Sequence, residues 1–172
     1  MSDAQSRRTV LSALFLGLVG SFTPRATRAE ALKADKVVIL KSRRLLLLMR
    51  DGKPFATFRV ALGSHPVGPK ESAGDGRTPE GFYHVDGRNR RSPYHLSLHL
   101  SYPNEIDRIS SDDRGETTGG DIAIHGMPAQ FGRTDPIGYF KDWTDGCISV
   151  GNVAIEKIWA AVDDGTPVEI RP

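Results

Sequence analysis

The sequence predicts a mainly β domain in which two sheets pack together with one or two short helices. Short runs rich in apolar and β-branched residues recur between residues 37 and 171, and turn-forming residues separate them. Apolar residues repeat at helical spacing over one longer stretch, which follows residue 152. These observations favour strands as the main element.

The first part of the domain is predicted to be antiparallel. Three successive strands are expected at residues 37–40, 45–49 and 55–62. Asp51 and Gly52 form a strong hairpin signal between the second and the third. Glycine, proline and charged residues dominate residues 63–79, which we expect to be a long functional loop.

The second part is predicted to continue with strands and to include a helix. Further strands are expected at residues 81–86, 94–102, 121–126 and 166–171. The polar segment 103–120 is expected to contain a helical turn at residues 105–109 and to form a lid over a groove. A helix after Asn152 is predicted from Ile155, Ile158, Trp159 and Val162, with Gly165 just past its end.

The N-terminus has the pattern of a cleavable export signal. Arg7 and Arg8 precede an apolar stretch, residues 10–20, and the segment ends in a small residue. We therefore expect residues 1–29 to be a signal peptide, of the twin-arginine or the Sec type, and residues 30–172 to be the mature domain. The apolar stretch is too short to span a bilayer comfortably, so no stable membrane span is expected after cleavage. The mature protein is expected in the periplasm or the cell envelope.

The charge of the mature domain argues against a nucleic-acid partner. The whole chain has 23 basic and 21 acidic residues, but four arginines and one aspartate belong to the expected signal peptide. The mature domain then carries 19 basic and 20 acidic residues, which gives no excess of positive charge to attract a polyanion.

The chain has a single cysteine, Cys147, so it cannot form an internal disulfide. Such a thiol is either a buried filler or a nucleophile. Gly146 permits a tight turn just before it, and Asn152 can cap a helix just after it, which favours a reactive thiol at a strand-to-helix turn. Backbone N–H groups near Gly146 and Cys147 would then stabilise an oxyanion.

His125 is the best-placed base among the five histidines. A strand at residues 121–126 would deliver its imidazole at the rim of a sheet, and Gly126 allows another backbone to come close. The carbonyl of Gly126 is a candidate acceptor for the Nδ1 proton. Pairing with an imidazolium would lower the pKa of the thiol. His95 and His99 are expected on the sheet surface, with lining of a groove as the alternative, and their spacing on a strand predicts no metal site.

The same residues resemble the signature of a known family. His125-Gly126, a spacer, Thr144-Asp145-Gly146-Cys147-Ile148 and then Asn152 are similar to the motif of the L,D-transpeptidase catalytic domain, also called the YkuD-type domain. Residues 76–83 and 95–104 resemble more narrowly its YafK-type murein branch. The resemblance spans residues 37–171 and implies a YkuD-type β-sandwich-like domain without a cofactor. One position departs from the family: the commoner pattern has arginine where this chain has Ser149.

The resemblance also implies a reaction. Family members act on peptidoglycan stem peptides, where a cysteine, here Cys147, attacks the carbonyl before a terminal D-alanine and a histidine, here His125, moves the protons. D-Alanine leaves, and an amine resolves the acyl-enzyme. This amine belongs to another stem peptide or to a lysine of a wall-attached lipoprotein. Such a transferase would serve cell-wall biogenesis and cell shape.

Two alternatives stay open. With water as the acceptor, the enzyme would be a hydrolase, an L,D-carboxypeptidase or an endopeptidase that releases stem-peptide or lipoprotein attachments. Without catalysis, the domain would be a wall-binding module, which would need no pair of cysteine and histidine.

Six residues near the motif are candidates for holding the substrate. They are Arg133, Lys141, Trp143, Thr144, Asp145 and Ser149. The two cations can pair with charged substrate groups, and the tryptophan can wall a groove. Strand alternation around Ile148 and Val150 favours a Ser149 side chain outside the core.

Overall fold

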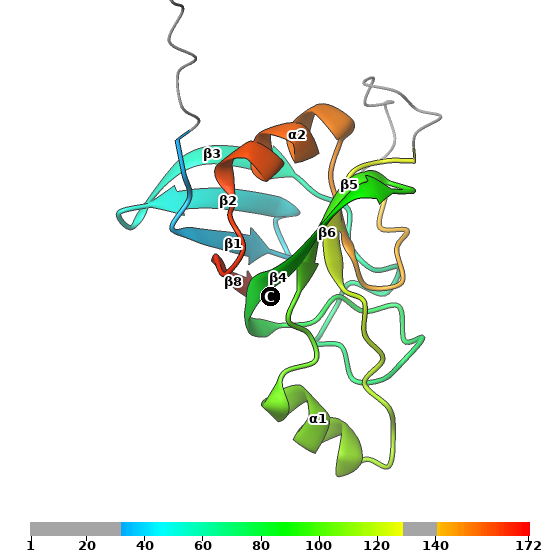
Figure 1. The fold of residues 1–172 in the computed structure, drawn as a ribbon. Helices are drawn as coiled ribbons and strands as arrows, with labels where there is room; N and C mark the ends of the chain where they lie inside the picture. The colour runs from blue at the N-terminus through cyan, green and yellow to red at the C-terminus, as the bar shows by residue number, and fades with distance from the viewer. Residues whose placement is uncertain (1–31, 129–140) are drawn as a thin grey trace, which may run out of the picture. The chain divides into compact units, whose positions relative to one another are not determined.

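A computed structural model describes residues 32–128 and 141–172 of the 172-residue chain (Figure 1). The expected signal peptide, residues 1–29, and the candidate residue Arg133 lie outside the described residues. Neither helix in the described part is long and apolar enough to cross a bilayer.

The described residues form eight strands and two short helices, which confirms the predicted mainly β class. The strands are β1 (Lys36–Leu40), β2 (Leu45–Arg50), β3 (Lys53–Arg59), β4 (Gly81–Ser92), β5 (His95–Leu100), β6 (Ala123–His125), β7 (Ile148–Ser149) and β8 (Pro167–Arg171). The helices are α1 (Glu105–Asp112) and α2 (Asn152–Ala161).

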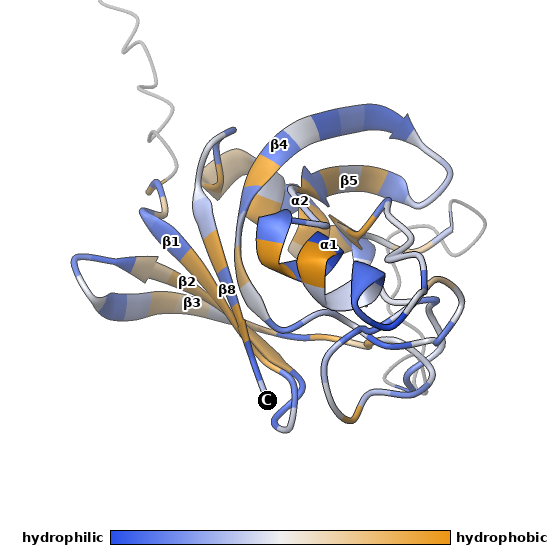
Figure 2. Ribbon diagram, turned by 90° about the horizontal axis from the view of Figure 1, so that it is seen from below, coloured by the Kyte–Doolittle hydropathy of each residue, from blue (hydrophilic) through white to orange (hydrophobic). Residues whose placement is uncertain are grey.

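The strands follow one another in a mixed order, β3-β2-β1-β8-β4-β5-β6-β7. Strand β4 joins two halves of this arrangement, because residues 81–84 pair with β8 and residues 85–92 pair with β5. The register shifts between Val85 and Gly87, and β4 curves from one half to the other (Figure 2). The two expected sheets are therefore linked through one long strand.

Strand β4 extends beyond its predicted end at residue 86. Residues 87–92 read Gly-Arg-Asn-Arg-Arg-Ser, a polar composition typical of a loop. In the fold, the guanidinium of Arg88 stacks on Trp159 of α2, 4.0 Å from the ring centroid. A partner from a distant helix therefore allows a polar run to continue as a strand.

The β2–β3 hairpin and helix α1 form where the sequence predicts them. Asp51 and Gly52 both have positive φ, 50° and 73°, as in a type I′ turn. The helical turn expected at residues 105–109 becomes α1, which begins with a reciprocal capping box between Asn104 and Asp107.

Helix α2 packs as predicted but begins differently. Ile155 and Ile158 are fully buried in the core. The residue before the helix is Gly151, so Asn152 is not its cap. Instead, the side-chain oxygen of Asn152 accepts the N–H of Met127 at 2.7 Å. Asn152 thus ties the start of α2 to the segment that follows β6.

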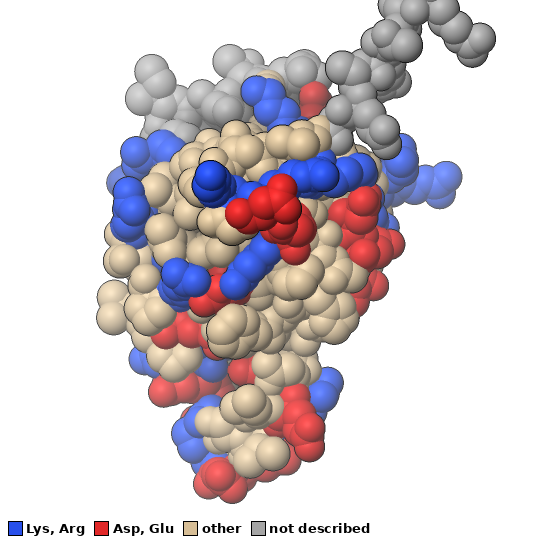
Figure 3. All heavy atoms as spheres, turned by 90° about the vertical axis from the view of Figure 1, so that its left-hand side faces the viewer, with Lys and Arg blue, Asp and Glu red and all other residues tan. Residues whose placement is uncertain are grey.

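One hydrophobic core connects both halves of the sheet with α2. Its buried side chains come from every strand except β3, and from α2 and the adjoining loops. Figure 2 shows apolar residues along α2 and on the strands around it. On the face drawn in Figure 3, Lys and Arg side chains lie among Asp and Glu side chains, so both signs of charge mix there.

Lys41 fastens the long loop of residues 63–80 to the end of β1. This loop contains no helix and no strand, as expected. Lys41 is 2% exposed, and its Nζ donates to the carbonyls of Gly68 and Thr78 at 2.5 and 2.7 Å and to Glu80 Oε1 at 2.8 Å. Burial lowers the pKa of Lys41, and the Glu80 carboxylate opposes that shift. One ammonium therefore holds two separate parts of the loop.

We predict that Lys41→Met lowers the free energy of unfolding by about 3–5 kcal/mol, because it leaves the Glu80 carboxylate and two carbonyls without their donor. Urea denaturation measures this change. Lys33→Met is the matched control. Lys33 also pairs with a carboxylate, that of Asp163, but this pair is exposed to solvent. Loss of the Lys33 ammonium should therefore lower the free energy of unfolding by less than about 1 kcal/mol. Equal losses in the two variants would show that Lys41 does not hold the loop.

Candidate active site

Strands β6 and β7 bring His125 and Cys147 to one face of the sheet. The two strands are parallel neighbours, and His125 lies opposite Ser149. Cys147 directly precedes β7, so side-chain alternation places its sulfur on the same face as the imidazole. Ile124 and Ile148 point the other way and are fully buried in the core.

Gly146 lets a second backbone segment touch the turn before Cys147. Its φ is +130°, and a Cβ built on it would lie 2.6 Å from the carbonyl oxygen of Arg77 and 3.0 Å from Ile122 Cδ1. Both the backbone conformation and the lack of space require glycine. Loop 63–80 therefore sits directly against the cysteine turn.

Buried Thr144 closes this turn from within. Its hydroxyl donates to the carbonyl of Cys147 at 2.7 Å and accepts the N–H of Gly146 at 3.2 Å. Upstream, the Asp142 carboxylate accepts the N–H of Leu62 at 2.9 Å. These contacts fix both ends of the cysteine turn, so the Thr144 side chain is engaged in positioning it.

The thiol of Cys147 is half-buried, and it donates to the carbonyl of Asp121 at 3.4 Å. Burial raises the pKa of the thiol, because the low-dielectric surroundings penalise the thiolate. The N–H of Ala123 and the Lys70 ammonium oppose this shift, whereas the carboxylates of Asp121 and Asp145 add to it. The pKa moves upward, so the resting sulfur carries its proton.

His125 is 3% exposed, and its Nδ1–H donates to the carbonyl of Gly126 at 2.7 Å. A carbonyl can only accept, so this contact places the proton on Nδ1 and leaves a lone pair on Nε2. The sequence suggested this acceptor, and the contact is confirmed. Burial lowers the pKa of His125, and the Gly126 carbonyl offsets part of the shift.

The expectation of a thiol whose pKa is lowered by an imidazolium was wrong for the resting site. Burial shifts the pKa of Cys147 upward and that of His125 downward, and both shifts favour the uncharged forms. A thiolate–imidazolium pair would have to recover the hydration that two buried charges lose. The resting site therefore holds a neutral thiol and a neutral imidazole.

Two aromatic rings surround the imidazole. The ring of Tyr94 lies 4.4 Å from that of His125, and the ring of Trp143 lies 5.9 Å from each of them. Trp143 is 38% exposed, so it can wall a groove as the sequence suggested. Sequence reasoning missed Tyr94, because its place beside His125 depends on the pairing of β5 with β6.

Gly126 allows three segments to meet behind His125. A Cβ there would lie 2.5 Å from Asn152 Oδ1, 2.8 Å from the carbonyl oxygen of Tyr94 and 2.9 Å from Ile155 Cγ2. A side chain at this position would push α2 away from the strand that carries the histidine. Gly126 and Asn152 therefore act as packing residues.

Ser149 is 2% exposed, so the expectation of a side chain outside the core was wrong. Its N–H and carbonyl both bond to Ala61 at 2.9 Å, while β6 pairs on the other side. Alternation exposes every second residue only where one face is open, and here both faces are covered. The Ser149 hydroxyl contacts Met127 Sδ at 3.3 Å.

The remaining candidates differ in their access to a ligand. Lys141 and Asp145 are exposed beside the cysteine turn. His95 and His99 each pair with a carboxylate, at 3.1 and 2.5 Å, which agrees with the surface interpretation. In residues 32–128 and 141–172, no group of three or more His, Cys, Asp or Glu side chains is arranged to hold a metal ion.

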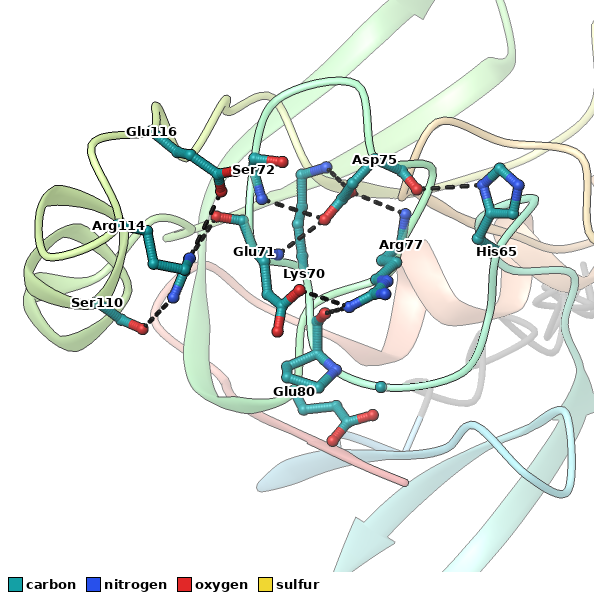
Figure 4. A network of polar contacts seen from close by, with 12 residues as sticks. His65, Lys70, Glu71, Ser72, Asp75, Arg77, Glu80, Ser110, Arg114 and Glu116 are labelled. Carbon is teal, nitrogen blue, oxygen red and sulfur yellow. Dashed lines mark hydrogen bonds and ion pairs between the residues drawn. The ribbon is translucent and has the colours of Figure 1, made fainter.

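A groove of about 590 Å³ opens along loop 63–80. Its lining includes Ser64, His65, Glu71, Asp75 and Arg77. The N–H of Ser64 bonds to the carbonyl of Thr144 at 2.9 Å, and the carbonyl of Arg77 touches Gly146, so the groove adjoins the cysteine turn. Figure 4 shows Lys70 turned toward Asp75, and Arg77 turned toward Glu71, within this loop. The length of the loop predicted a functional segment, but not which residues line it.

Comparison with known protein families matches residues 34–170 to the YkuD family, described as the L,D-transpeptidase catalytic domain. Among curated proteins, the chain is 29% identical over 161 residues to YafK of Escherichia coli K12, which is named as a candidate L,D-transpeptidase. The aligned region covers 86% of this chain and 57% of YafK.

Solved structures share the fold. Pgp2, the helical cell shape determining protein of Campylobacter jejuni, matches with a TM-score of 0.60 and 31% identity, over 78% of this chain and 46% of that one. Bd1075 of Bdellovibrio bacteriovorus matches with a TM-score of 0.57 and 23% identity, over 84% of this chain and 50% of that one, a likeness of fold. The chain thus spans about half the length of the relatives it matches.

We predict that Gly146→Ala lowers the free energy of unfolding by about 2–4 kcal/mol, because it adds backbone strain and a clash with the Arg77 carbonyl. Gly120→Ala is the control, since a Cβ at Gly120 meets nothing within 4 Å and its φ is not in the left-handed region. Thermal denaturation should separate the two variants clearly. A Gly146→Ala protein as stable as Gly120→Ala would mean that loop 63–80 does not depend on this contact.

We predict that alkylation of Cys147 by iodoacetamide follows a pH profile with a midpoint above ~8.5, the ordinary pKa of a thiol. Iodoacetamide reacts with the thiolate, and burial raises the pKa of Cys147, so the rate should keep rising above neutral pH. Labelling reactions that are quenched at set times and analysed by mass spectrometry give the alkylation rate at each pH. A plateau that extends below pH 7 would instead identify a stable thiolate–imidazolium pair.

Proposed function

Because the chain belongs to the YkuD family of L,D-transpeptidase catalytic domains, we propose that it is a cysteine-dependent acyltransferase that acts on peptidoglycan stem peptides. The acyl donor is the residue before a terminal D-alanine, and an amine of the cell wall is the acceptor. One observation gives the strongest support. The hydrogen bond from His125 Nδ1 to the Gly126 carbonyl leaves Nε2 as a base on the face of the sheet to which Cys147 belongs.

In the first half-reaction, the thiol of Cys147 attacks the carbonyl carbon that precedes D-alanine. His125 Nε2 takes the thiol proton as the carbon–sulfur bond forms, so the sulfur need not ionise beforehand. The resulting imidazolium then protonates the departing amine. The carbon–nitrogen bond breaks, D-alanine leaves, and a thioester to Cys147 remains.

The oxyanion of the tetrahedral intermediate needs hydrogen-bond donors. The N–H of Gly146 already donates to Thr144 Oγ1 at 3.2 Å. The N–H of Cys147 has no acceptor among the described residues, so we assign it as the donor that the turn presents to the oxyanion. Gly146 contributes by the turn it permits.

In the second half-reaction, an acceptor amine attacks the thioester carbonyl. His125 Nε2 takes a proton from the attacking nitrogen and returns it to the sulfur as the carbon–sulfur bond breaks. The amine of a second stem peptide gives a cross-link, and a lysine of a wall-attached lipoprotein offers the same functional group. With water in place of the amine, the same steps give hydrolysis.

The exposed groups around the turn are the proposed contacts for the stem peptide. Trp143 offers an apolar wall beside His125, and Lys141 and Asp145 offer charges of opposite sign at the surface. Arg133 is proposed as a further cation. Ser149 is buried, so we propose that it acts on substrate holding only through its neighbour Met127. The substrate and the expected signal peptide, residues 1–29, lead us to propose export to the periplasm or cell envelope.

Incubation with tetrapeptide muropeptides should yield a Cys147 thioester adduct, which adds to the protein the mass of the muropeptide minus the mass of the released D-alanine. Intact-protein and peptide mass spectrometry detect it, and the released products separate transfer to an amine from hydrolysis. Cys147→Ala should release no D-alanine while it keeps a cooperative unfolding transition. Full turnover by that variant would mean that another group is the nucleophile, and no D-alanine release by the unmodified protein would instead favour a wall-binding module.

We predict that His125→Asn lowers the rate of D-alanine release by about 10²–10⁴-fold, because no other group moves the protons. His99→Asn is the matched control. The Nδ1 of His99 also has a partner, Asp86 Oδ1 at 2.5 Å, but this contact is on the surface. His99→Asn should change the rate less than about twofold. A loss in His99→Asn as large as that in His125→Asn would mean that the base has been assigned wrongly.

A further inference from the structure

Two lysines are buried against loop 63–80, and they differ in what they contact. Lys41 donates to three oxygen acceptors, as described above. The Lys70 side chain is 3% exposed, and among the described residues its Nζ has one hydrogen-bond partner, Asp75 Oδ1 at 2.7 Å. An ammonium has three N–H donors. Lys70 therefore keeps unused N–H donors for a further partner.

Asp75 holds Lys70 from within the loop (Figure 4). Its carboxylate also accepts the backbone N–H groups of Glu71, Ser72 and Arg77 at 2.7, 3.1 and 2.9 Å. Burial by itself would raise the pKa of Asp75, but the Lys70 ammonium and these N–H groups lower it to about 2. The carboxylate is thus ionised at any pH near neutrality, and the ammonium is fixed in one place.

Two contacts place Lys70 beside the cysteine turn. Arg77 donates its backbone N–H to Asp75, and the carbonyl of Arg77 touches Gly146. On the other flank, a Cβ at Gly119 would lie 3.8 Å from Lys70 Cε, and two residues later the carbonyl of Asp121 accepts the Cys147 thiol. Lys70 is therefore linked through Asp75 to the segment that touches Gly146, and it lies near the segment that leads to Asp121. Its charge opposes the effect of burial on the pKa of that thiol.

Building on the proposed function, we propose that Lys70 is a positioning residue whose fixed positive charge stabilises the negative charge that develops at the Cys147 end of the site during acyl transfer. Asp75 orients this cation and does not touch the substrate. Such a charge is useful to the mechanism, because the carboxylates of Asp121 and Asp145 disfavour negative charge on the half-buried sulfur. The described groups that act on the pKa of the thiol are these two carboxylates, the Ala123 N–H and Lys70, and His125 lies on the neighbouring strand on the same face of the sheet.

A charge of this kind favours the transition state over the resting state. The resting thiol and imidazole are neutral, so the charge of Lys70 does little to stabilise the resting state. When the proton moves to His125, negative charge appears on the sulfur and on the substrate oxygen, and a cation already in place stabilises it without reorganisation. Lys70 should therefore affect kcat for D-alanine release more than KM.

The test compares iodoacetamide profiles of Cys147 in Lys70→Met, Lys70→Arg and the control Lys33→Met. Lys70→Met should raise the apparent pKa of the thiol by about one unit, which is a roughly tenfold slower alkylation at neutral pH. Lys70→Arg should restore most of the shift. Lys33→Met should leave the pKa of Cys147 unchanged, because Lys33 pairs with Asp163 at the surface.

An unshifted profile in Lys70→Met, or an equal shift in Lys33→Met, would overturn the proposal. If Lys70→Met does not fold, Asp75→Asn provides the test, because it keeps the cation and removes its counter-charge. The apparent pKa of Cys147 should then fall, and a rise would overturn the proposal. Alkylation needs no substrate, so its outcome is independent of the proposed function, which fails instead if Cys147→Ala still releases D-alanine.

Discussion

The site depends on a contact between two backbones, where the carbonyl of Arg77 touches Gly146 without a side chain between them. Loop 63–80 has no helix or strand of its own, so its place is set by what it touches. Lys41 holds parts of it to the end of β1, and Gly146 receives it at the cysteine turn. The groove and the Lys70–Asp75 pair lie beside the thiol for this reason. Position 146 therefore requires glycine mainly because the Arg77 carbonyl leaves no space for a side chain there.

Burial sets the electrostatics of the site. It raises the pKa of Cys147 and lowers the pKa of His125, so both groups are neutral at rest. The Gly126 carbonyl then leaves Nε2 as the imidazole nitrogen without a proton. A neutral pair avoids the cost of two buried charges, and in the proposed reaction charge appears only as a substrate carbonyl is attacked. The same burial makes one fixed ammonium effective, since its field is weakly screened.

Local features could be predicted from the sequence, and features set by distant partners could not. The hairpin at Asp51 and the hydrogen bond from His125 to the carbonyl of Gly126 involve residues that are close in sequence. The local sequence was therefore sufficient to predict both features. Ser149 is buried because Ala61, far away in the chain, pairs with it. Tyr94 likewise reaches His125 only through the packing of distant segments. Motif spacing pointed to Cys147 and His125 as the proposed reacting pair, but not to the loop charges around them.

Nitrogen-15 NMR of histidine-labelled protein tests the neutral pair most directly, with His125→Asn for assignment. A neutral Nδ1–H tautomer of His125 is expected at pH 7, with protonation only below ~6.5, the ordinary pKa of histidine. Cys147→Ala should leave this titration nearly unchanged, since the thiol carries no charge to hold a proton on the ring. Two protonated ring nitrogens at pH 7, of which one is lost in Cys147→Ala, would contradict the neutral pair and establish a thiolate–imidazolium site.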